Sequence, residues 1–281
     1  MKTGIIDVGG GLRGIYGAGV LDRCMDEGIA FDVCVGVSAG SANMAAFLAG
    51  QRGRNYRFYA SYPQRPAYMG LGALLHTGSY IDLDYVYGTL SNDGGEDPLD
   101  YEACVNAAGE LFVVATDAVT GEAVYFTKAD LKPNDYKIFN ASCAMPVACR
   151  PQTVAGRAYY DGGVSDPVPV KKALSLGCEK LVLILTRPLD YDAESRMDAA
   201  AARILKKSAP AVSQKLTERG KAYREGVARA KELQTEGRCL ILAPDDLGGV
   251  GTVTRDSDKL FMLYGRGYRD AGKIASFLRR P

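Results

Sequence analysis

The chain has 281 residues, and its 34 Lys and Arg side chains nearly balance its 33 Asp and Glu side chains. This length allows a sizeable buried core, and the balance of charges argues against a general nucleic-acid-binding protein, which would carry a basic excess. The seven cysteines are scattered and have no CxxC spacing, so we expect neither disulfides nor a zinc site.

The first residues run directly into a strand-like segment, with no apolar signal region. No apolar run approaches the roughly 18 residues that a membrane-spanning helix needs. We therefore expect a cytoplasmic protein, and peripheral contact with the inner surface of a membrane stays open.

Short apolar strands alternate with helices along much of the chain, which predicts an α/β fold with a mainly parallel sheet covered on both faces. Strands are expected over residues 3–8, 33–37, 111–117, 124–127, 181–186 and 239–243. Helices are expected over residues 15–27, 41–48 and 258–278, and residues 200–237 are expected to form either one long helix or two helices broken near Pro210.

Residues 62–101 fit this alternation less well, because they are rich in Tyr, Gly and Pro and have weak periodicity. A long connection of this kind is often a lid or a binding loop. The apolar side chains of residues 62–101 could form an acyl-binding wall or a membrane-contacting lid. The alternative is that they only pack in the core. The side chains concerned are Tyr68, Met69, Leu71, Leu74 and Leu75.

The sequence Gly-Val-Ser-Ala-Gly at 36–40 is a GxSxG motif placed between an expected strand and an expected helix. Glycines on either side of Ser38 allow the sharp turn that exposes a nucleophilic hydroxyl. The start of the next helix adds free amides and a positive dipole end. The alternative is a tight turn in which Ser38 only caps that helix.

Residues 9–14, Gly-Gly-Gly-Leu-Arg-Gly, also lie between a strand and a helix and fit the dinucleotide-binding pattern GxGxxG. That interpretation requires an acidic residue at the end of the second strand, whereas Asp32 precedes this strand. We therefore favour an oxyanion hole, in which each donor lowers the barrier by about 3–4 kcal/mol. Arg13 either fixes this loop or biases it towards anions, and the alternative is a surface salt bridge.

The tripeptide Asp-Gly-Gly at 161–163 follows the strand-like residues 158–160. Most such tripeptides are simple turns, but this one follows a glycine loop and a serine elbow in the same chain. The single histidine, His76, lies between Ser38 and Asp161, whereas α/β-hydrolases have the order serine, acid, histidine. A histidine base is therefore disfavoured.

Together these motifs resemble the patatin-like phospholipase family: residues 9–14 match its GGGxRG loop, 36–40 its GxSxG elbow and 161–163 its DGG tripeptide. The small-residue stretch 140–146 and the segment 167–170 are also similar. The resemblance covers roughly residues 3–190 and is weaker beyond them. It implies a three-layer α/β/α fold, with a catalytic domain over residues 1–190 and an extension over 191–281 that packs on it.

The resemblance also implies a dyad in which Asp161 accepts the proton of Ser38 as an acyl-enzyme forms. The amides of Gly10, Gly11 and Ala39 would hold the oxyanion. The supporting motif residues are Gly9, Arg13, Gly14, Gly36, Gly40, Gly162 and Gly163.

Substrates of the family are phospholipids, lysophospholipids, galactolipids and other carboxylic esters, and most members need no metal. We therefore expect a lipase or esterase of the phospholipase A or lysophospholipase type, with no cofactor and no metal. A catalytically silent lipid-binding or scaffold protein on the same fold is the alternative.

The expected helix at 200–237 carries many basic residues, but Glu218, Glu225, Glu232 and Glu236 are interleaved with them. A solvated charged face is favoured over contact with anionic lipid headgroups. The basic residues are Lys206, Lys207, Lys215, Arg219, Lys221, Arg224, Arg229 and Lys231.

Overall fold

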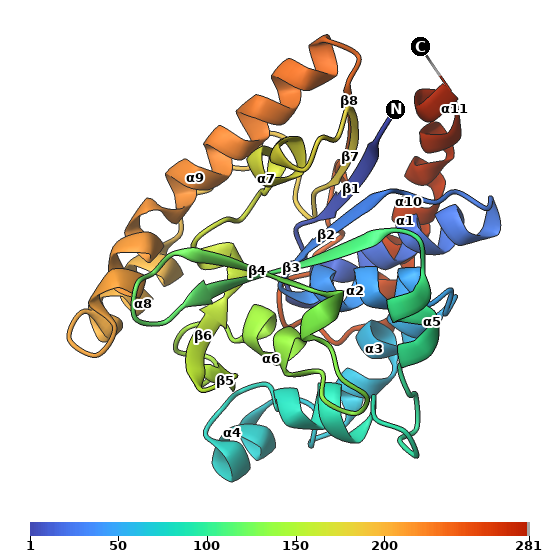
Figure 1. Ribbon diagram of the computed structural model, residues 1–281. Helices are drawn as coiled ribbons and strands as arrows, with labels where there is room; N and C mark the ends of the chain where they lie inside the picture. The colour runs from blue at the N-terminus through green and yellow to red at the C-terminus, as the bar shows by residue number, and fades with distance from the viewer. Residues whose placement is uncertain (280–281) are drawn as a thin grey trace.

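A central sheet of eight strands runs through the molecule in the computed structural model, which describes residues 1–279 (Figure 1). Its strand order is β5-β6-β3-β2-β1-β7-β8, with β4 paired to β3. The strands are β1 (Thr3–Asp7), β2 (Val33–Val37), β3 (Glu110–Asp117), β4 (Ala123–Thr127), β5 (Gln152–Val154), β6 (Arg157–Asp161), β7 (Lys180–Ile184) and β8 (Cys239–Leu242). Five neighbouring strands of the sheet, β3, β2, β1, β7 and β8, are parallel to one another. The antiparallel pairs are β3 with β4, β3 with β6, and β5 with β6. The predicted mainly parallel sheet is confirmed.

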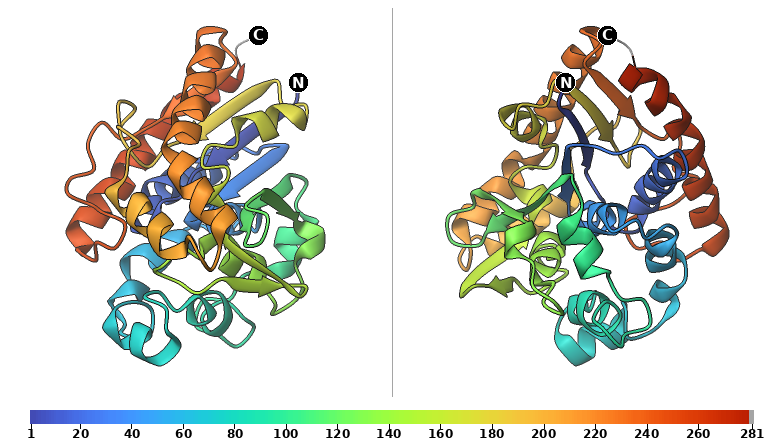
Figure 2. Two further views of the ribbon diagram at one scale, coloured as in Figure 1. Left: turned by 90° about the vertical axis from the view of Figure 1, so that its left-hand side faces the viewer. Right: turned by 45° about the vertical axis from the view of Figure 1, so that its right-hand side comes forward.

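Helices cover both faces of the sheet, and Figure 2 shows α9 crossing one face while α10 and α11 lie on the other. The helices are α1 (Ile15–Asp26), α2 (Ala39–Leu48), α3 (Arg54–Ala60), α4 (Leu71–Thr77), α5 (Tyr101–Asn106), α6 (Lys137–Cys143), α7 (Val170–Ser175), α8 (Arg196–Leu205), α9 (Pro210–Thr235), α10 (Ser257–Asp270) and α11 (Ile274–Arg279). The predicted three-layer α/β/α arrangement is therefore confirmed.

Two apolar clusters, one on each face, hold the layers together. Along β1, Ile5 packs with α1, α2 and α10, whereas Ile6 packs with α7 and α9 on the opposite face. Successive side chains of a strand point to opposite faces, so a strand that is covered on both sides is apolar at most of its positions. This is why the strands read as continuous apolar runs.

Two of the expected helical regions are divided in the structure. The region predicted at 200–237 forms α8 and α9, and Pro210 is the first residue of α9. A proline fits there because the first turn of a helix has no partner for its amide. The region predicted at 258–278 forms α10 and α11, separated by the 3₁₀ turn Ala271–Lys273.

The last third of the chain contributes to the same layers as the first. Strand β8 pairs with β7, and α10 packs along α1, where the Tyr16 hydroxyl donates to Asp270 Oδ2 at 2.7 Å. The division of the chain at residue 190 stays a prediction.

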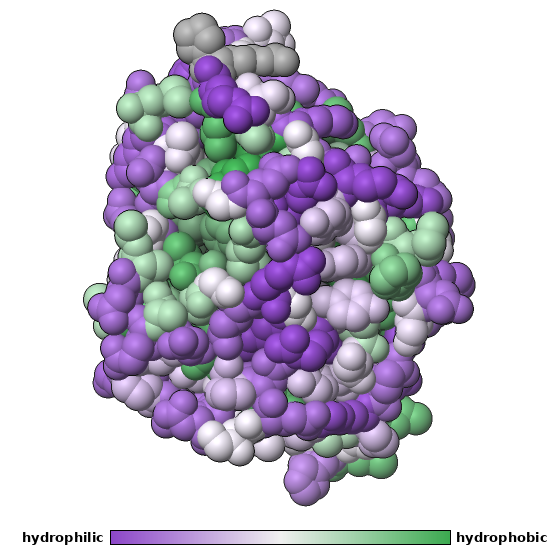
Figure 3. Space-filling model, turned by 90° about the vertical axis from the view of Figure 1, so that its right-hand side faces the viewer, coloured by the Kyte–Doolittle hydropathy of each residue, from purple (hydrophilic) through white to green (hydrophobic). Residues whose placement is uncertain are grey.

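On the side of the molecule shown in Figure 3, hydrophilic side chains predominate and hydrophobic ones occupy smaller areas between them.

None of the helices within residues 1–279 is both long enough and apolar enough to cross a membrane.

Candidate active site

Ser38 lies at the sharp turn between β2 and α2. Its backbone has φ of 54° and ψ of −134°, which is a strained conformation for a residue other than glycine. The Ser38 amide donates to Ser142 Oγ at 3.0 Å, and the Ser142 hydroxyl donates to the Val114 carbonyl at 2.6 Å. The Ser38 carbonyl accepts the Ser41 hydroxyl at 2.7 Å. These contacts hold the elbow, as expected of a positioned nucleophile.

The Ser38 hydroxyl donates directly to Asp161 Oδ2 at 2.6 Å. Asp161 is the last residue of β6 and is only 5% exposed, and its second oxygen accepts the Gly163 amide at 2.8 Å. Burial raises the pKa of Asp161 above its usual range, while the hydrogen bond from Ser38 and the charge of Arg219 oppose this shift. A raised pKa makes the carboxylate a better proton acceptor. The two residues predicted from separate motifs thus lie in hydrogen-bond contact.

The glycine loop packs directly against the elbow. Gly9, Gly10 and Gly11 all have positive φ, at 65°, 118° and 59°. A Cβ on Gly9 would clash with the Val37 carbonyl oxygen and the Gly40 amide nitrogen. Glycine is therefore required there both for its backbone angles and for the close approach of the two chain segments.

Three backbone amides near Ser38 are free to bind a negative charge. Within residues 1–279 the amides of Gly10 and Gly11 have no hydrogen-bond partner. Ala39 is the first residue of α2, so its amide has no partner within the helix. Gly10 lines a cavity on one side of Ser38, and Gly11 and Ala39 line a cavity on the other. Each of the three predicted oxyanion donors thus belongs to a residue that borders a cavity at Ser38, and their role as donors stays a prediction.

A buried polar network beneath the glycine loop was not predicted from the sequence. Asp7 is fully buried at the end of β1, where Oδ1 accepts the Gly9 amide at 2.9 Å and Oδ2 accepts the Asn43 side chain at 2.8 Å. The Tyr59 hydroxyl donates to Asn43 Oδ1 at 2.9 Å. Burial raises the pKa of Asp7 to about 6. The network links the glycine loop to α2 and α3. In the sequence, the one feature that could have indicated it is the acidic Asp7 in an otherwise apolar strand.

Two cavities meet at Ser38. The first has a volume of about 70 Å³ and a mostly apolar wall that includes Phe58, Tyr68, Met69 and Val86. The second, of about 130 Å³, has Asp161 in its wall and three arginines, Arg13, Arg187 and Arg219. The serine hydroxyl therefore lies between an apolar side and a cationic side.

The remaining predicted residues divide between the site and the surface. Tyr68 and Met69 line the apolar cavity, and Leu74 lines a separate groove that reaches Asp161. Leu71 and Leu75 are exposed on α4, at 73% and 87%, and line neither cavity at Ser38. The tyrosine-rich segment thus contributes its inner face to the site.

His76 is exposed on α4 and lies outside the residues that line the two cavities at Ser38. Arg219, by contrast, was interpreted as part of a solvated helix face, but it reaches the site. Its Nε donates to the Gly163 carbonyl at 2.6 Å, and its Nη1 pairs with Asp198 at 3.1 Å. The glutamates interleaved along this segment suggested that all of its basic residues face solvent. The contact of Arg219 with the site could not be predicted from them, because only one turn of α9 faces the site.

The other motif glycines lie where backbone segments approach closely. A Cβ on Gly36 would meet Ser41, one on Gly40 would meet Asp7, and one on Gly162 would meet Val114. Gly14 faces the Tyr59 hydroxyl in the same way. These positions allow the elbow, the loop and the Asp161 strand to pack against one another.

Comparison with known proteins adds an independent line of evidence. The family model for patatin-like phospholipase matches residues 8–174, which is more than half of the chain. The protein YjjU of Escherichia coli K12 is 31% identical over 192 residues, covering 66% of this chain and 52% of that protein. The NTE family protein Rv1063c of Mycobacterium tuberculosis H37Rv is 24% identical over 180 residues, covering 62% and 46%. The chain thus spans about half the length of these curated relatives.

Among solved structures, the crystal structure of VipD from Legionella pneumophila aligns with a TM-score of 0.48 at 15% identity, covering 98% of this chain and 66% of that one. The match of the family model over residues 8–174 includes both the serine elbow and the aspartate that accepts its hydrogen bond. The chain belongs to the patatin-like phospholipase family.

Proposed function

We propose that this protein is a serine acyl hydrolase that cleaves carboxylic esters of lipids through Ser38 and Asp161. The observation that carries the proposal is the 2.6 Å hydrogen bond from the Ser38 hydroxyl to a buried carboxylate. A serine hydroxyl is a weak nucleophile until an adjacent base removes its proton. In this proposal the Asp161 carboxylate is that base, and no histidine is needed.

In the proposed reaction Ser38 Oγ attacks the ester carbonyl carbon while its proton passes to Asp161. The carbonyl oxygen becomes an oxyanion, and the amides of Gly10, Gly11 and Ala39 stabilise its charge. When the tetrahedral intermediate collapses, the bond to the leaving alcohol breaks and the alcohol takes the proton from Asp161. Water then attacks the acyl-enzyme by the same route and releases the free acid.

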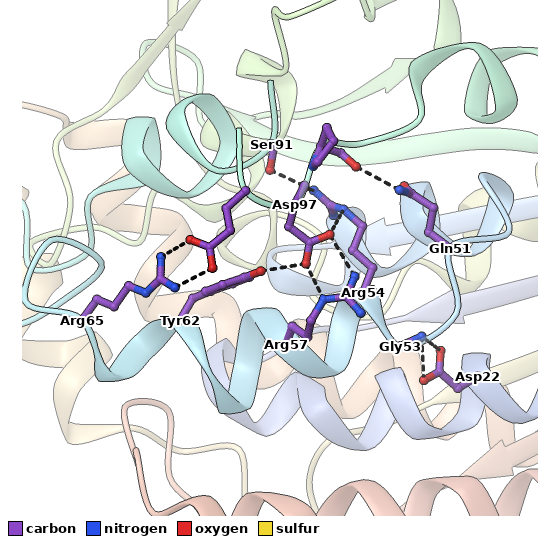
Figure 4. A network of polar contacts seen from close by, with 11 residues as sticks. Asp22, Gln51, Gly53, Arg54, Arg57, Tyr62, Arg65, Ser91 and Asp97 are labelled. Atoms are coloured by element: carbon purple, nitrogen blue, oxygen red, sulfur yellow. Dashed lines mark hydrogen bonds and ion pairs between the residues drawn. The ribbon is translucent and has the colours of Figure 1, made fainter. Parts of the chain in front are cut away.

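The apolar cavity supports an acyl group as the part of the substrate bound on that side. Its wall is aromatic and aliphatic, but Arg54 also lines it. The Arg54 guanidinium donates to Ser91 Oγ at 2.9 Å and to the Asp97 carbonyl at 3.0 Å, and Asp97 also binds Arg57 and Tyr62 (Figure 4). Pushing an alkyl chain into this buried charged network would be costly. We therefore propose short or medium acyl chains.

A fluorophosphonate probe tests the function, because it reacts covalently with an activated serine. We expect one label on the native protein, mapped by peptide mass spectrometry to Ser38. Ser38→Ala should lose both the label and cleavage of medium-chain esters, and activity of the native protein should persist with a chelator present. Ser175→Ala, which changes an exposed serine on α7, is the matched control and should behave like the native protein.

Ester cleavage that persists in Ser38→Ala above trace levels would show that the nucleophile is wrong. A native protein that binds medium-chain esters but neither reacts with the probe nor cleaves them would instead be a lipid-binding protein on this fold.

A further inference from the structure

The cationic cavity beside Ser38 is built from three distant parts of the chain. Arg13 lies in the glycine loop, Arg187 follows β7, and Arg219 comes from α9. The proposed reaction gives none of these side chains a role. Whether their charges are already compensated decides what the cavity can bind.

Arg13 is buried, with 7% of its surface exposed, yet its guanidinium group has few hydrogen-bond partners. Its Nη1 donates to Thr252 Oγ1, and its Nε has no hydrogen-bond partner within residues 1–279. Burial, together with the smaller effect of the nearby Arg187 and Arg219 charges, lowers the pKa of Arg13 to about 10. A buried cation with unused donors is costly unless an anion meets it.

Arg187 and Arg219 differ in how their charge is compensated. Arg219 pairs with Asp198 and also binds the Gly163 carbonyl. The Arg187 guanidinium lies over the ring of Tyr191, with 4.0 Å to its centroid. In the described part of the chain, neither Arg187 nor Arg13 has a carboxylate within 4.0 Å. Two arginines in one cavity thus lack a counter-ion.

We propose that Arg13 and Arg187 bind an anionic group carried by the leaving alcohol of the ester. This inference rests on the proposed function, because it divides one substrate between the two cavities at Ser38. The acyl group occupies the apolar cavity, so the leaving alcohol extends into the other one. A phosphate monoester or a carboxylate suits planar guanidinium groups, which bind such oxygens through paired hydrogen bonds.

The same geometry disfavours a zwitterionic headgroup. A choline cation would enter a cavity that already contains two uncompensated arginines. Its usual partner, the face of an aromatic ring, is occupied at Tyr191 by Arg187. The favoured substrates are therefore acidic esters, and neutral or phosphocholine esters of equal acyl length should be cleaved less efficiently.

Three esters with the same decanoyl group test this: 1-decanoylglycerol 3-phosphate, 1-decanoylglycerophosphocholine and 1-decanoylglycerol. The native protein should have its highest kcat/KM on the phosphate monoester. Arg187→Gln should lower that kcat/KM by about 10- to 100-fold, which is the range for a hydrogen bond to a charged group, mainly through KM. Its kcat/KM on 1-decanoylglycerol should change little, and Arg187→Lys should recover part of the loss.

Arg203→Gln is the matched control, because it removes the same charge from an exposed position on α8 outside the cavity. It should leave the order of the three esters unchanged. Equal kcat/KM values for all three esters, with Ser38 still required, would overturn the inference and leave the proposed function standing.

Calorimetric titration of Ser38→Ala with 1-decanoylglycerol 3-phosphate gives a readout that does not depend on turnover. Binding should weaken when Arg187→Gln is added, and unchanged binding would overturn the inference. Inorganic phosphate should inhibit cleavage of the phosphate monoester competitively. If it instead accelerates cleavage of 1-decanoylglycerol, the cavity binds a free anion, and the assignment to the leaving alcohol is wrong.

Discussion

The atoms proposed to do the chemistry and the surfaces proposed to select the substrate are built in different ways. Ser38 and Asp161 each lie at or next to the end of a strand, and glycine backbone packs against them. The two cavity walls instead consist of side chains from segments far apart in the sequence, such as Met69 and Arg187. The reactive centre is therefore fixed by backbone, and selectivity depends on side chains that can vary independently.

This difference explains what the sequence could predict. Each motif is continuous in the chain, and a glycine beside a strand end has a steric meaning that needs no knowledge of the fold. The elbow at Ser38 and the loop at residues 9–14 were predicted for that reason. Their contact with Asp161 was expected from the family resemblance, and the structure brings them together.

The parts that were not predicted depend on contacts between distant residues. The Asp7–Asn43–Tyr59 network joins β1, α2 and α3, and no periodicity marks it. Arg13 was expected either to act at the glycine loop or to form a surface salt bridge, and nothing in the sequence links it to Arg187, which is 174 positions away. Strand β5 and helix α7 were missed because segments of three and six residues carry too little pattern.

The largest expected effect comes from disturbing the backbone beneath the reactive centre. Gly9→Ala places a Cβ against the Val37 carbonyl in a left-handed conformation, and we expect a loss of about 3 kcal/mol or more in the free energy of unfolding. Gly50→Ala is the matched control, because Gly50 has φ of 67° but no atom within 4 Å of its added Cβ. It should cost only about 1 kcal/mol.

Urea unfolding of both variants measures the difference. Equal losses would mean that the close approach of loop and elbow adds nothing beyond backbone strain, and the contrast drawn above would lose its physical basis.

A pH-dependent effect, no larger than that of Gly9→Ala, is expected for the network beneath the loop. The pKa of Asp7 is about 6 in the folded protein against 3.8 for an ordinary aspartate. A raised pKa means that the folded state holds this proton more tightly, so its contribution to stability is complete below pH ~4 and is lost as the pH rises through ~6. A shift of this size corresponds to about 3 kcal/mol.

Asp7→Asn removes the titration while keeping most of the shape. The stability of the native protein relative to this variant should therefore fall between pH ~4 and ~6 and stay level above ~7. Urea unfolding of both proteins across this range gives the comparison, since other titrating groups largely cancel. A difference that does not change with pH would contradict the assigned pKa shift.

The central claim is that Asp161, and not the single histidine, activates Ser38. The most direct test is the rate at which a fluorophosphonate labels Ser38 in the native protein, in Asp161→Asn and in His76→Ala. Circular dichroism and thermal melting confirm that each variant is folded. The native rate should rise with pH as Asp161 ionises, through a pKa above the usual range for aspartate.

An asparagine at 161 is nearly isosteric with the carboxylate but cannot accept the proton, so Asp161→Asn should label about 10²- to 10⁴-fold more slowly. His76→Ala should label at the native rate, because His76 is exposed on α4 outside both cavities at Ser38. The reverse pattern, with Asp161→Asn labelled at the native rate and His76→Ala unreactive while both remain folded, would contradict the Ser38–Asp161 dyad.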